Sequence, residues 1–158
     1  MTTQQTRTAS TRDRDAISQW GLVIEGFQNT NKNLHKAIAS AFSLDPAESE
    51  TILRLARSPQ QRMPMAALAR DAAFSTGGFT KIADRLAKRD LVCRNPCADD
   101  RRVTYLELTP SGVEMANELL CLVADIVRST YIEVIGRERA ALVAEAMADL
   151  REANKEGK

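Results

Sequence analysis

Polar and cationic side chains recur on one predicted helix face between residues 75 and 85. Ser75 is expected to cap the start of this helix, because its hydroxyl can accept a hydrogen bond from a backbone N–H of the first turn. The side chains that then share a face by their spacing are Thr76, Thr80, Lys81 and Arg85. Hydroxyl, ammonium and guanidinium groups of this kind bind base edges and phosphates in a DNA major groove.

A second cationic group lies in residues 99–102, whose sequence is Asp-Asp-Arg-Arg. It stands between two runs of strand-forming composition, 91–94 and 103–108, so an exposed hairpin turn would project it. A single polar, cationic helix is most often only a solvated helix face. A cationic hairpin tip beside it fits the adjacent minor groove. The two features together therefore favour DNA binding.

Gly77 and Gly78 fall inside the predicted cationic helix. The absence of side chains there would let the backbone approach DNA or the preceding helix closely. Two adjacent glycines are not a nucleotide-binding fingerprint, and the sequence has no nucleophile elbow, phosphate-binding glycine loop or paired His and carboxylate motif. We therefore expect no enzyme activity and no cofactor.

The charge of the chain is localised. The net charge of the 158 residues is only +1. Between Ser75 and Tyr105, however, seven basic and four acidic residues give a local net charge of +3, which leaves −2 for the remainder. A local positive field is what contact with phosphates needs, so the small total charge does not argue against nucleic acid.

Other compositional features bear on the compartment. No apolar run approaches the roughly 20 residues that cross a bilayer, and the first 15 residues lack an apolar signal core. The three cysteines are an odd number and argue against a disulfide framework. We expect a cytoplasmic protein without a membrane partner.

Hydrophobic periodicity predicts a mainly α-helical chain with a small β-wing, an α+β arrangement of the winged helix-turn-helix type. We expect a disordered tail at 1–12, an N-terminal dimerisation helix at 13–44, a DNA-binding lobe at 45–109 and C-terminal dimerisation helices at 110–158. Phe74 and Phe79 are expected to anchor the DNA-binding motif to its core.

Capping residues predict several helix boundaries. Asp45, Pro46 and Glu48 provide an N-cap, a proline at the first helical position and an acidic first turn, for a helix that runs to Arg57. The other boundaries are a short helix opened by Pro64 and running to about Ala72, a long helix from Thr109-Pro110 to Gly136, and a last helix after Gly136.

These residues together resemble the MarR (multiple antibiotic resistance regulator) family of bacterial transcriptional regulators. The matching segments are Leu68-Ala69, residues 75–86, Leu91-Val92, Asp100-x-Arg102 and Leu108-Thr109-Pro110-Ser111-Gly112. They cover about a third of the chain, and the flanking helices fit the same layout. Asp90 stands where the family usually has a glycine that ends the recognition helix, and Asp tolerates the left-handed backbone better than most residues.

The resemblance implies how the chain would bind DNA. It implies that Arg102 enters the minor groove while Asp100 holds its guanidinium, and Arg101 would face phosphate. It also implies a repressor on double-stranded DNA at a pseudo-palindromic operator. A small ligand, such as an aromatic carboxylate or a phenol, would release it by binding where the dimerising helices meet the DNA-binding lobe.

The terminal helices carry apolar stripes that are longer than a small winged domain can cover. A symmetric homodimer would cover them, and it would place two recognition helices about 34 Å apart, one DNA turn. The alternative is a monomeric bundle in which these helices pack on their own subunit. We favour the homodimer, because the resemblance implies interlocking first and last helices.

The resemblance also suggests residues for an effector pocket. One branch of the family binds urate-like ligands with a tryptophan of the first helix and acidic and arginine partners, which would be Trp20, Glu50 and Arg94 here. A further arginine expected for such a site is Ile82 in this sequence. Trp20 could instead pack in the core or at a dimer interface, and His35 could line a cavity or cap its neighbours.

Two other functions remain open. One is a redox or metal sensor on the same scaffold that uses Cys93, Cys97 or Cys121, with nearby arginines to stabilise a thiolate. Structural cysteines are the commoner case, and Cys93, Cys97 and the single histidine do not make a four-ligand metal site. The other is a helical protein–protein interaction module without DNA binding, against which the intact Asp100-x-Arg102 pair argues.

Overall fold

The computed structural model describes residues 8–71 and 76–154. These residues are mostly helical and contain one antiparallel sheet of three strands in the order β1-β3-β2. This confirms the expected α-rich fold with a small β-wing. The chain divides into two compact units, Met1–Asn33 and Leu34–Lys158. Among the described residues, no helix combines the length and apolarity that crossing a membrane requires.

Helix α1 (Thr11–Phe42) passes through the division between the units. Its start is capped reciprocally, because Asp13 Oδ2 accepts from the Ser10 N–H at 2.8 Å and Ser10 Oγ accepts from the Asp13 N–H at 3.2 Å. The hydrogen bonds that Asp13 Oδ2 accepts from the Ser10 backbone N–H, and then from the Ser10 hydroxyl at 2.9 Å, lower the pKa of Asp13. Because α1 begins at Thr11, the predicted disordered tail at 1–12 is too long by at least residues 11 and 12. Residues 1–7 lie outside the described part of the chain.

Helix α2 (Pro46–Arg57) begins as its sequence predicts. Asp45 Oδ1 accepts from the Glu48 N–H at 2.8 Å, and Glu48 Oε2 accepts from the Asp45 N–H at 3.0 Å. This reciprocal pair satisfies two N–H groups that the first turn leaves without helical partners. The helix ends at Arg57, before Ser58, as expected.

The segment after α2 was only partly predicted. A short turn, η1 (Pro59–Gln61), leads into strand β1 (Arg62–Pro64), which pairs antiparallel with β3. Pro64 therefore ends a strand, opposite Tyr105, and does not open the next helix. Proline is tolerated there because β1 is an edge strand. Helix α3 (Met65–Asp71) follows directly.

Helix α4 (Thr76–Lys88) ends in a Schellman turn centred on Asp90. Asp90 has a φ of 56°, in the left-handed region. The Leu91 N–H donates to the Leu86 carbonyl at 3.1 Å, and the Asp90 N–H donates to the Ala87 carbonyl at 3.0 Å. Leu86 and Leu91 are both buried. The expected left-handed helix end at Asp90 is thereby confirmed.

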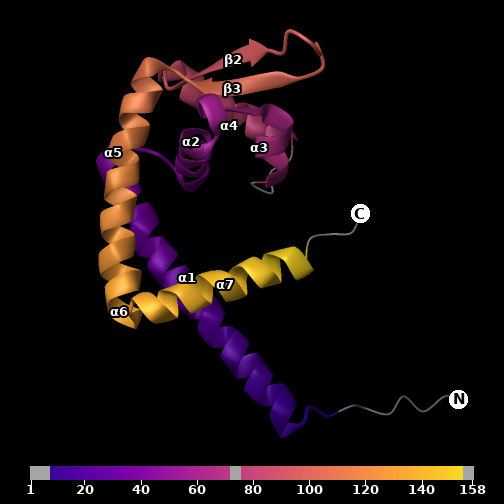
Figure 1. Cartoon of the computed structure of the whole chain (residues 1–158), viewed down its shortest axis with the longest axis vertical. Coiled ribbons are helices and arrows are strands. Elements are labelled where there is room, and N and C mark those ends of the chain that lie inside the picture. The colour runs from indigo at the N-terminus through magenta and orange to yellow at the C-terminus, as the bar shows by residue number, and fades with distance from the viewer. Residues whose placement is uncertain (1–7, 72–75, 155–158) are drawn as a thin grey trace, which may run out of the picture. The chain divides into compact units, whose positions relative to one another are not determined.

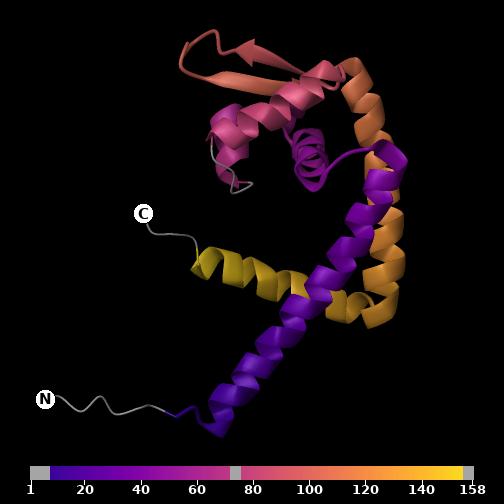
Figure 2. The same ribbon diagram turned by 180° about the vertical axis from the view of Figure 1, so that it is seen from behind.

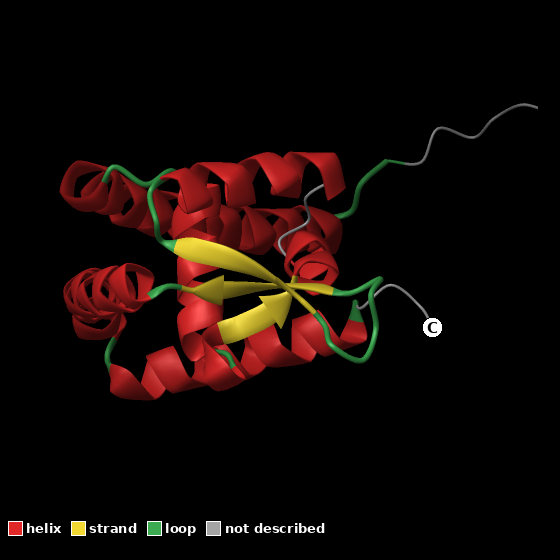
Figure 3. Cartoon of the chain, turned by 90° about the horizontal axis from the view of Figure 1, so that it is seen from above, coloured by secondary structure: helices red, strands yellow, loops and turns green. Residues whose placement is uncertain are grey.

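The wing is the hairpin of β2 (Val92–Pro96) and β3 (Thr104–Leu108). Leu106 and Leu108 are buried, while Tyr105 faces the other side, its ring centre 4.9 Å from the Arg62 guanidinium carbon. This agrees with the alternation expected for β3. Figure 3 shows the three strands side by side, and in Figures 1 and 2 the hairpin turn reaches past α4.

The predicted long helix after Thr109 is helical throughout but not regular. Helix α5 (Pro110–Val127) continues into a π-helical turn, η2 (Arg128–Ile132), and a short helix, α6 (Glu133–Ile135). Gly136, with a φ of 83°, then separates it from α7 (Arg137–Ala153). Thr109 caps α5, since its Oγ1 accepts from the Gly112 N–H at 3.0 Å.

The hydrophobic core of the second unit brings together side chains from the end of α1, from α2 to α5 and from the wing. Its large, fully buried members include Ile38, Leu44, Ile52, Leu55, Leu68, Phe79, Leu86, Leu106 and Leu119. The anchoring role expected of Phe79 is confirmed by its burial, and Phe74 lies outside the described residues.

Gly112 lies against the backbone at the end of α4. A Cβ added there would stand 1.9 Å from the Leu91 carbonyl oxygen, which belongs to backbone and cannot rotate away. We predict that Gly112→Ala lowers the free energy of unfolding by about 3 kcal/mol, because the turn must open to admit the methyl group. Urea unfolding followed by circular dichroism measures this change.

Gly77→Ala is the matched control, because no atom of the described residues lies within 4 Å of a Cβ at that helical position. It should raise the free energy of unfolding by roughly 0.5–1 kcal/mol, since alanine is the better helix former. Equal urea midpoints for Gly112→Ala and the parent chain would contradict the assigned contact.

Candidate nucleic-acid interface

Helix α4 has one open face and one buried face. Phe79, Ile82 and Leu86 are buried in the core. Thr80 and Lys81 are exposed, as is Gly77, which meets no atom of the described residues within 4 Å of a hypothetical Cβ. Packing among the described residues therefore does not explain why position 77 is a glycine.

Other residues expected on this face are described only in part. Ser75 lies outside the described residues. Thr76 begins α4, and nothing is described of its side chain. Gly78 is half-buried within α4. The open face that the structure describes thus contains Gly77, Thr80 and Lys81.

Arg85 differs from the expectation that it joins the DNA-facing set. Its guanidinium binds two carboxylates at the start of α2: Nε donates to Glu48 Oε1 at 2.8 Å, and Nη2 donates to Asp45 Oδ2. The hydrogen bond to Glu48 and the nearby negative charges raise the pKa of Arg85 further above its usual value. We therefore leave Arg85 out of the proposed DNA-contacting set, because its donors already serve the corner between α1 and α2.

The wing turn holds Asp100 and Arg102 in a three-bond contact. Asp100 Oδ1 accepts from the Arg102 backbone N–H at 3.0 Å and from Nε at 3.1 Å, and Oδ2 accepts from Nη2 at 3.2 Å. The hydrogen bonds from the Arg102 side chain, and then from its backbone, lower the pKa of Asp100. The side chain of Arg102 is nevertheless 91% exposed, so a cation stands in solvent in a fixed orientation. Arg101 beside it is also exposed.

The acidic and arginine residues considered for an effector site have partners close by. Arg94 donates to Asp84 Oδ1 at 2.8 Å and to the Thr80 carbonyl at 3.3 Å. Glu50 pairs instead with Arg54, one turn along α2, at 2.7 Å. In this structure Glu50 and Arg94 thus each bind a residue of their own surroundings, and their grouping in an effector site stays a prediction.

The two remaining members lie on α1. Trp20 belongs to the first unit and is 56% exposed. His35 belongs to the second unit and is half-buried, and its Nδ1 has no hydrogen-bond partner among the described residues. Their part in an aromatic ligand site stays a prediction.

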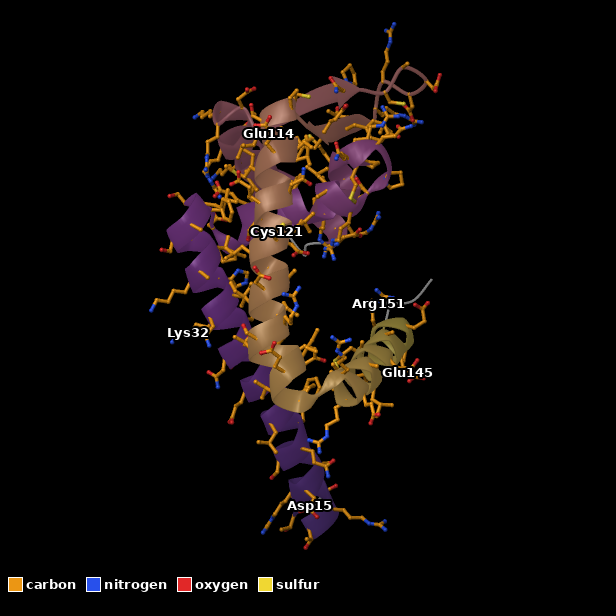
Figure 4. All side chains as sticks on the ribbon, turned by 60° about the vertical axis from the view of Figure 1, so that its left-hand side comes forward. Asp15, Lys32, Glu114, Cys121, Glu145 and Arg151 are labelled. Carbon is orange, nitrogen blue, oxygen red and sulfur yellow. The ribbon has the colours of Figure 1, made fainter. Side chains whose placement is uncertain are left out.

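The cysteines are free in the structure. Cys121 on α5, labelled in Figure 4, and Cys93 on β2 are exposed, and Cys97 after β2 is half-buried. In the part of the chain that is described, no three His, Cys, Asp or Glu side chains gather as a metal site would require.

A small hollow lies between α3, α4 and the wing. Its volume is about 300 Å³, and its lining consists of Pro64, Met65, Ala66, Ala69, Phe79, Thr80, Arg102, Val103 and Thr104. No sequence pattern predicts this hollow, because its wall combines Pro64 of β1, residues of α3 and α4, and residues 102–104 at the turn end of the wing.

Comparison with known proteins supports the fold. No protein-family model matches the sequence. A segment of 89 residues is 27% identical to the HTH-type transcriptional regulator MhqR of Bacillus subtilis. This match covers 56% of the chain and spans only 57% of the length of MhqR.

Solved structures match over more of the chain. AbsC, a MarR family transcriptional regulator from Streptomyces coelicolor, superposes with a TM-score of 0.80 at 24% identity, over 94% of this chain and 97% of AbsC. Sco3205 from the same organism, in complex with DNA, gives 0.80 at 22% identity over 96% and 92%. A mutant of MarR from E. coli complexed with operator DNA gives 0.69 at 19% identity over 89% and 99%. The winged helix-turn-helix fold of this chain, with its helices at both ends, is the fold of MarR family transcriptional regulators.

Proposed function

We propose that this protein is a DNA-binding transcriptional regulator of the MarR family, and not an enzyme. The observation that carries the proposal is the exposed Arg102, which Asp100 orients at the tip of the wing. Arginine in a fixed orientation suits a narrow minor groove, where the electrostatic potential is most negative. Two proteins of the same fold have been crystallised with DNA, which supports this use of the wing.

In this proposal α4 enters the adjacent major groove. Thr80 and Lys81 contact bases or phosphates from its open face, and Gly77 lets the backbone approach the DNA. Arg101 binds a phosphate beside the minor groove. Ser75, Thr76 and Gly78 belong to the same segment by their positions in the sequence, and they complete the proposed contact set.

The protein acts as a homodimer in this proposal. Leu142 on α7 is 64% exposed, and Val143, Met147 and Leu150 on the same helix are also exposed. On α1, Ile17, Leu22 and Phe27 are each about two-thirds exposed. Apolar side chains in such numbers favour burial against another protein surface. A second copy is the simplest partner, and its two-fold axis matches a pseudo-palindromic operator.

The homodimer is a repressor that a small aromatic ligand releases from its operator. The hollow between α3, α4 and the wing supports this step, because its 300 Å³ reaches the lower end of the range for ligand sites. Its lining is mainly apolar, and Arg102 forms part of its wall. A carboxylate bound there would occupy the guanidinium that the minor groove needs.

The DNA-binding role of Arg102 is tested first. We predict that Arg102→Ala weakens binding to the DNA that flanks its own gene by about 10- to 100-fold, because a contact in the groove is lost. Fluorescence anisotropy of a labelled duplex, measured at several salt concentrations, gives the affinity and its salt dependence. Unchanged affinity for Arg102→Ala would refute the role of Arg102, and parent protein whose binding ignores salt would refute the DNA-binding proposal.

Arg128→Ala is the control for this measurement. Arg128 is an exposed arginine of η2 that pairs with Asp125, so its removal deletes the same charge away from the wing and α4. Its affinity for the duplex should stay within about twofold of the parent, as expected for a surface residue outside the contact set.

The dimer proposal makes a separate prediction. Leu142→Glu should shift the protein toward monomer in sedimentation analysis, because a charge would be placed in an apolar interface. Arg151→Glu is the control, since Arg151 lies nine residues further along α7, about half a turn round the helix (Figure 4). A parent protein that sediments as a monomer would exclude the homodimer.

Ligand release is tested with benzoate, a small aromatic carboxylate. Millimolar benzoate should lower the affinity of the parent protein for the duplex by about tenfold, within the usual range of coupling between two ligands. Acetate at equal ionic strength is the control and should have no such effect. If benzoate and acetate act alike, the hollow is not the release site for aromatic carboxylates.

A further inference from the structure

Two arginines at the C-terminal end of α4 bind the corner where α1 meets α2. Arg85 of α4 donates to the carboxylates of Asp45 and Glu48. Arg89, in the turn directly after α4, donates to the Phe42 carbonyl at 2.8 Å and to the Ser43 carbonyl at 3.0 Å. Both side chains thus reach from the end of α4 to one short segment of the chain.

The acceptors at this corner are fixed by their own structure. The Glu48 side chain is only 8% exposed, and its two oxygens divide their roles: Oε2 binds the Asp45 N–H, and Oε1 binds Arg85. A buried carboxylate is costly unless it is paired, so Glu48 depends on Arg85. The carbonyls that bind Arg89 stand at the end of α1, where helical partners are absent.

Helix α4 is also tied to the wing. Arg94 of β2 donates to the Asp84 carboxylate and to the Thr80 carbonyl, 2.8 and 3.3 Å away. Polar contacts from α2 and from β2 therefore both hold α4. Arg85 lies one helical turn after Lys81, so its contact with α2 borders the open face and orients it.

We propose that Arg85 and Glu48 are positioning residues, which set the orientation of α4 against α2 and so determine DNA affinity without touching DNA. This inference rests on the proposed function and deepens it. It assigns a role to a buried carboxylate that the DNA-contacting set does not use. The positioning role predicts that neutralising Glu48 weakens DNA binding, whereas electrostatic repulsion alone predicts that it strengthens binding.

The sign of the effect is the basis of the test. Neutralising a carboxylate close to DNA normally strengthens binding, because phosphates are repelled less. If Glu48 positions α4, neutralising it weakens binding. Glu48→Gln suits this test, because glutamine keeps the reciprocal cap with Asp45 but loses the charge that binds Arg85.

We expect Glu48→Gln to lower the affinity for the labelled duplex by about tenfold, within the range seen for residues that act indirectly. The slope of log affinity against log salt should stay at the parent value, because no phosphate contact is lost. Arg85→Gln should behave in the same way, and the double variant should lose little more than either single variant. Circular dichroism at the assay temperature verifies that all variants are folded.

Glu50→Gln is the matched control. Glu50 lies on the same helix but pairs with Arg54 within α2, so its neutralisation should leave affinity unchanged or slightly higher. Binding by Glu48→Gln that equals or exceeds the parent would overturn the inference. A slope of log affinity against log salt that is smaller by about 1 in Arg85→Gln than in the parent would also overturn the inference, because this change indicates a lost phosphate contact.

A readout without DNA separates this inference from the proposed function. Amide hydrogen exchange in residues 77–88 reports how firmly α4 is held. Exchange there should be faster in Glu48→Gln than in Glu50→Gln, and equal rates would overturn the positioning role. If the parent chain fails to bind DNA, the proposed function fails, while the exchange comparison still decides whether Glu48 and Arg85 hold α4.

Discussion

The meeting of three backbone segments at Leu91 is the constraint on which the DNA-binding lobe depends. The Leu91 carbonyl accepts the Thr109 N–H at 3.1 Å, and Gly112 lies so close to it that no side chain fits between them. Thr109 also donates through its hydroxyl to the Asp90 carbonyl. The end of α4, the first residue before the wing and the start of α5 are thereby joined at one point. Both α4 and the wing extend from this junction, so the junction determines how far the cationic side chains of α4 lie from those of the wing.

The arginines of the lobe fall into two groups with different surroundings. Arg85, Arg89 and Arg94 are bound to carboxylates or carbonyls of neighbouring elements, and they connect α4 to the rest of the lobe. Arg101 and Arg102 stand at the exposed wing turn. A count of basic residues therefore overstates the charge that faces outward. What matters for DNA is which guanidinium groups reach the surface, and that of Arg102 does so while it is paired with Asp100.

The sequence predicted those features that depend on near neighbours. The caps at Asp45 and Thr109 and the left-handed turn at Asp90 involve residues a few positions apart, so their signals are local. The role of Arg85 depends on a partner 37 residues away, and helix spacing cannot tell which neighbour an arginine will meet. Strand β1 has only three residues and takes its conformation from β3, so it shows no periodicity. The π-helical turn Arg128–Ile132 likewise contains no proline or glycine that would mark it in the sequence.

The contact between Asp100 and Arg102 has a consequence for the entropy of complex formation. An arginine with free rotation gives up many rotamers when it enters a groove, and this loss opposes association. The hydrogen bonds from Arg102 Nε and Nη2 to Asp100, two residues away, restrict the rotamers of Arg102 in the protein alone. The lowered pKa of Asp100 keeps this carboxylate ionised in mildly acidic solution, so the restraint persists there. The entropy cost of ordering the Arg102 side chain is therefore part of the free energy of folding, and the side chain loses fewer rotamers when the protein binds a duplex.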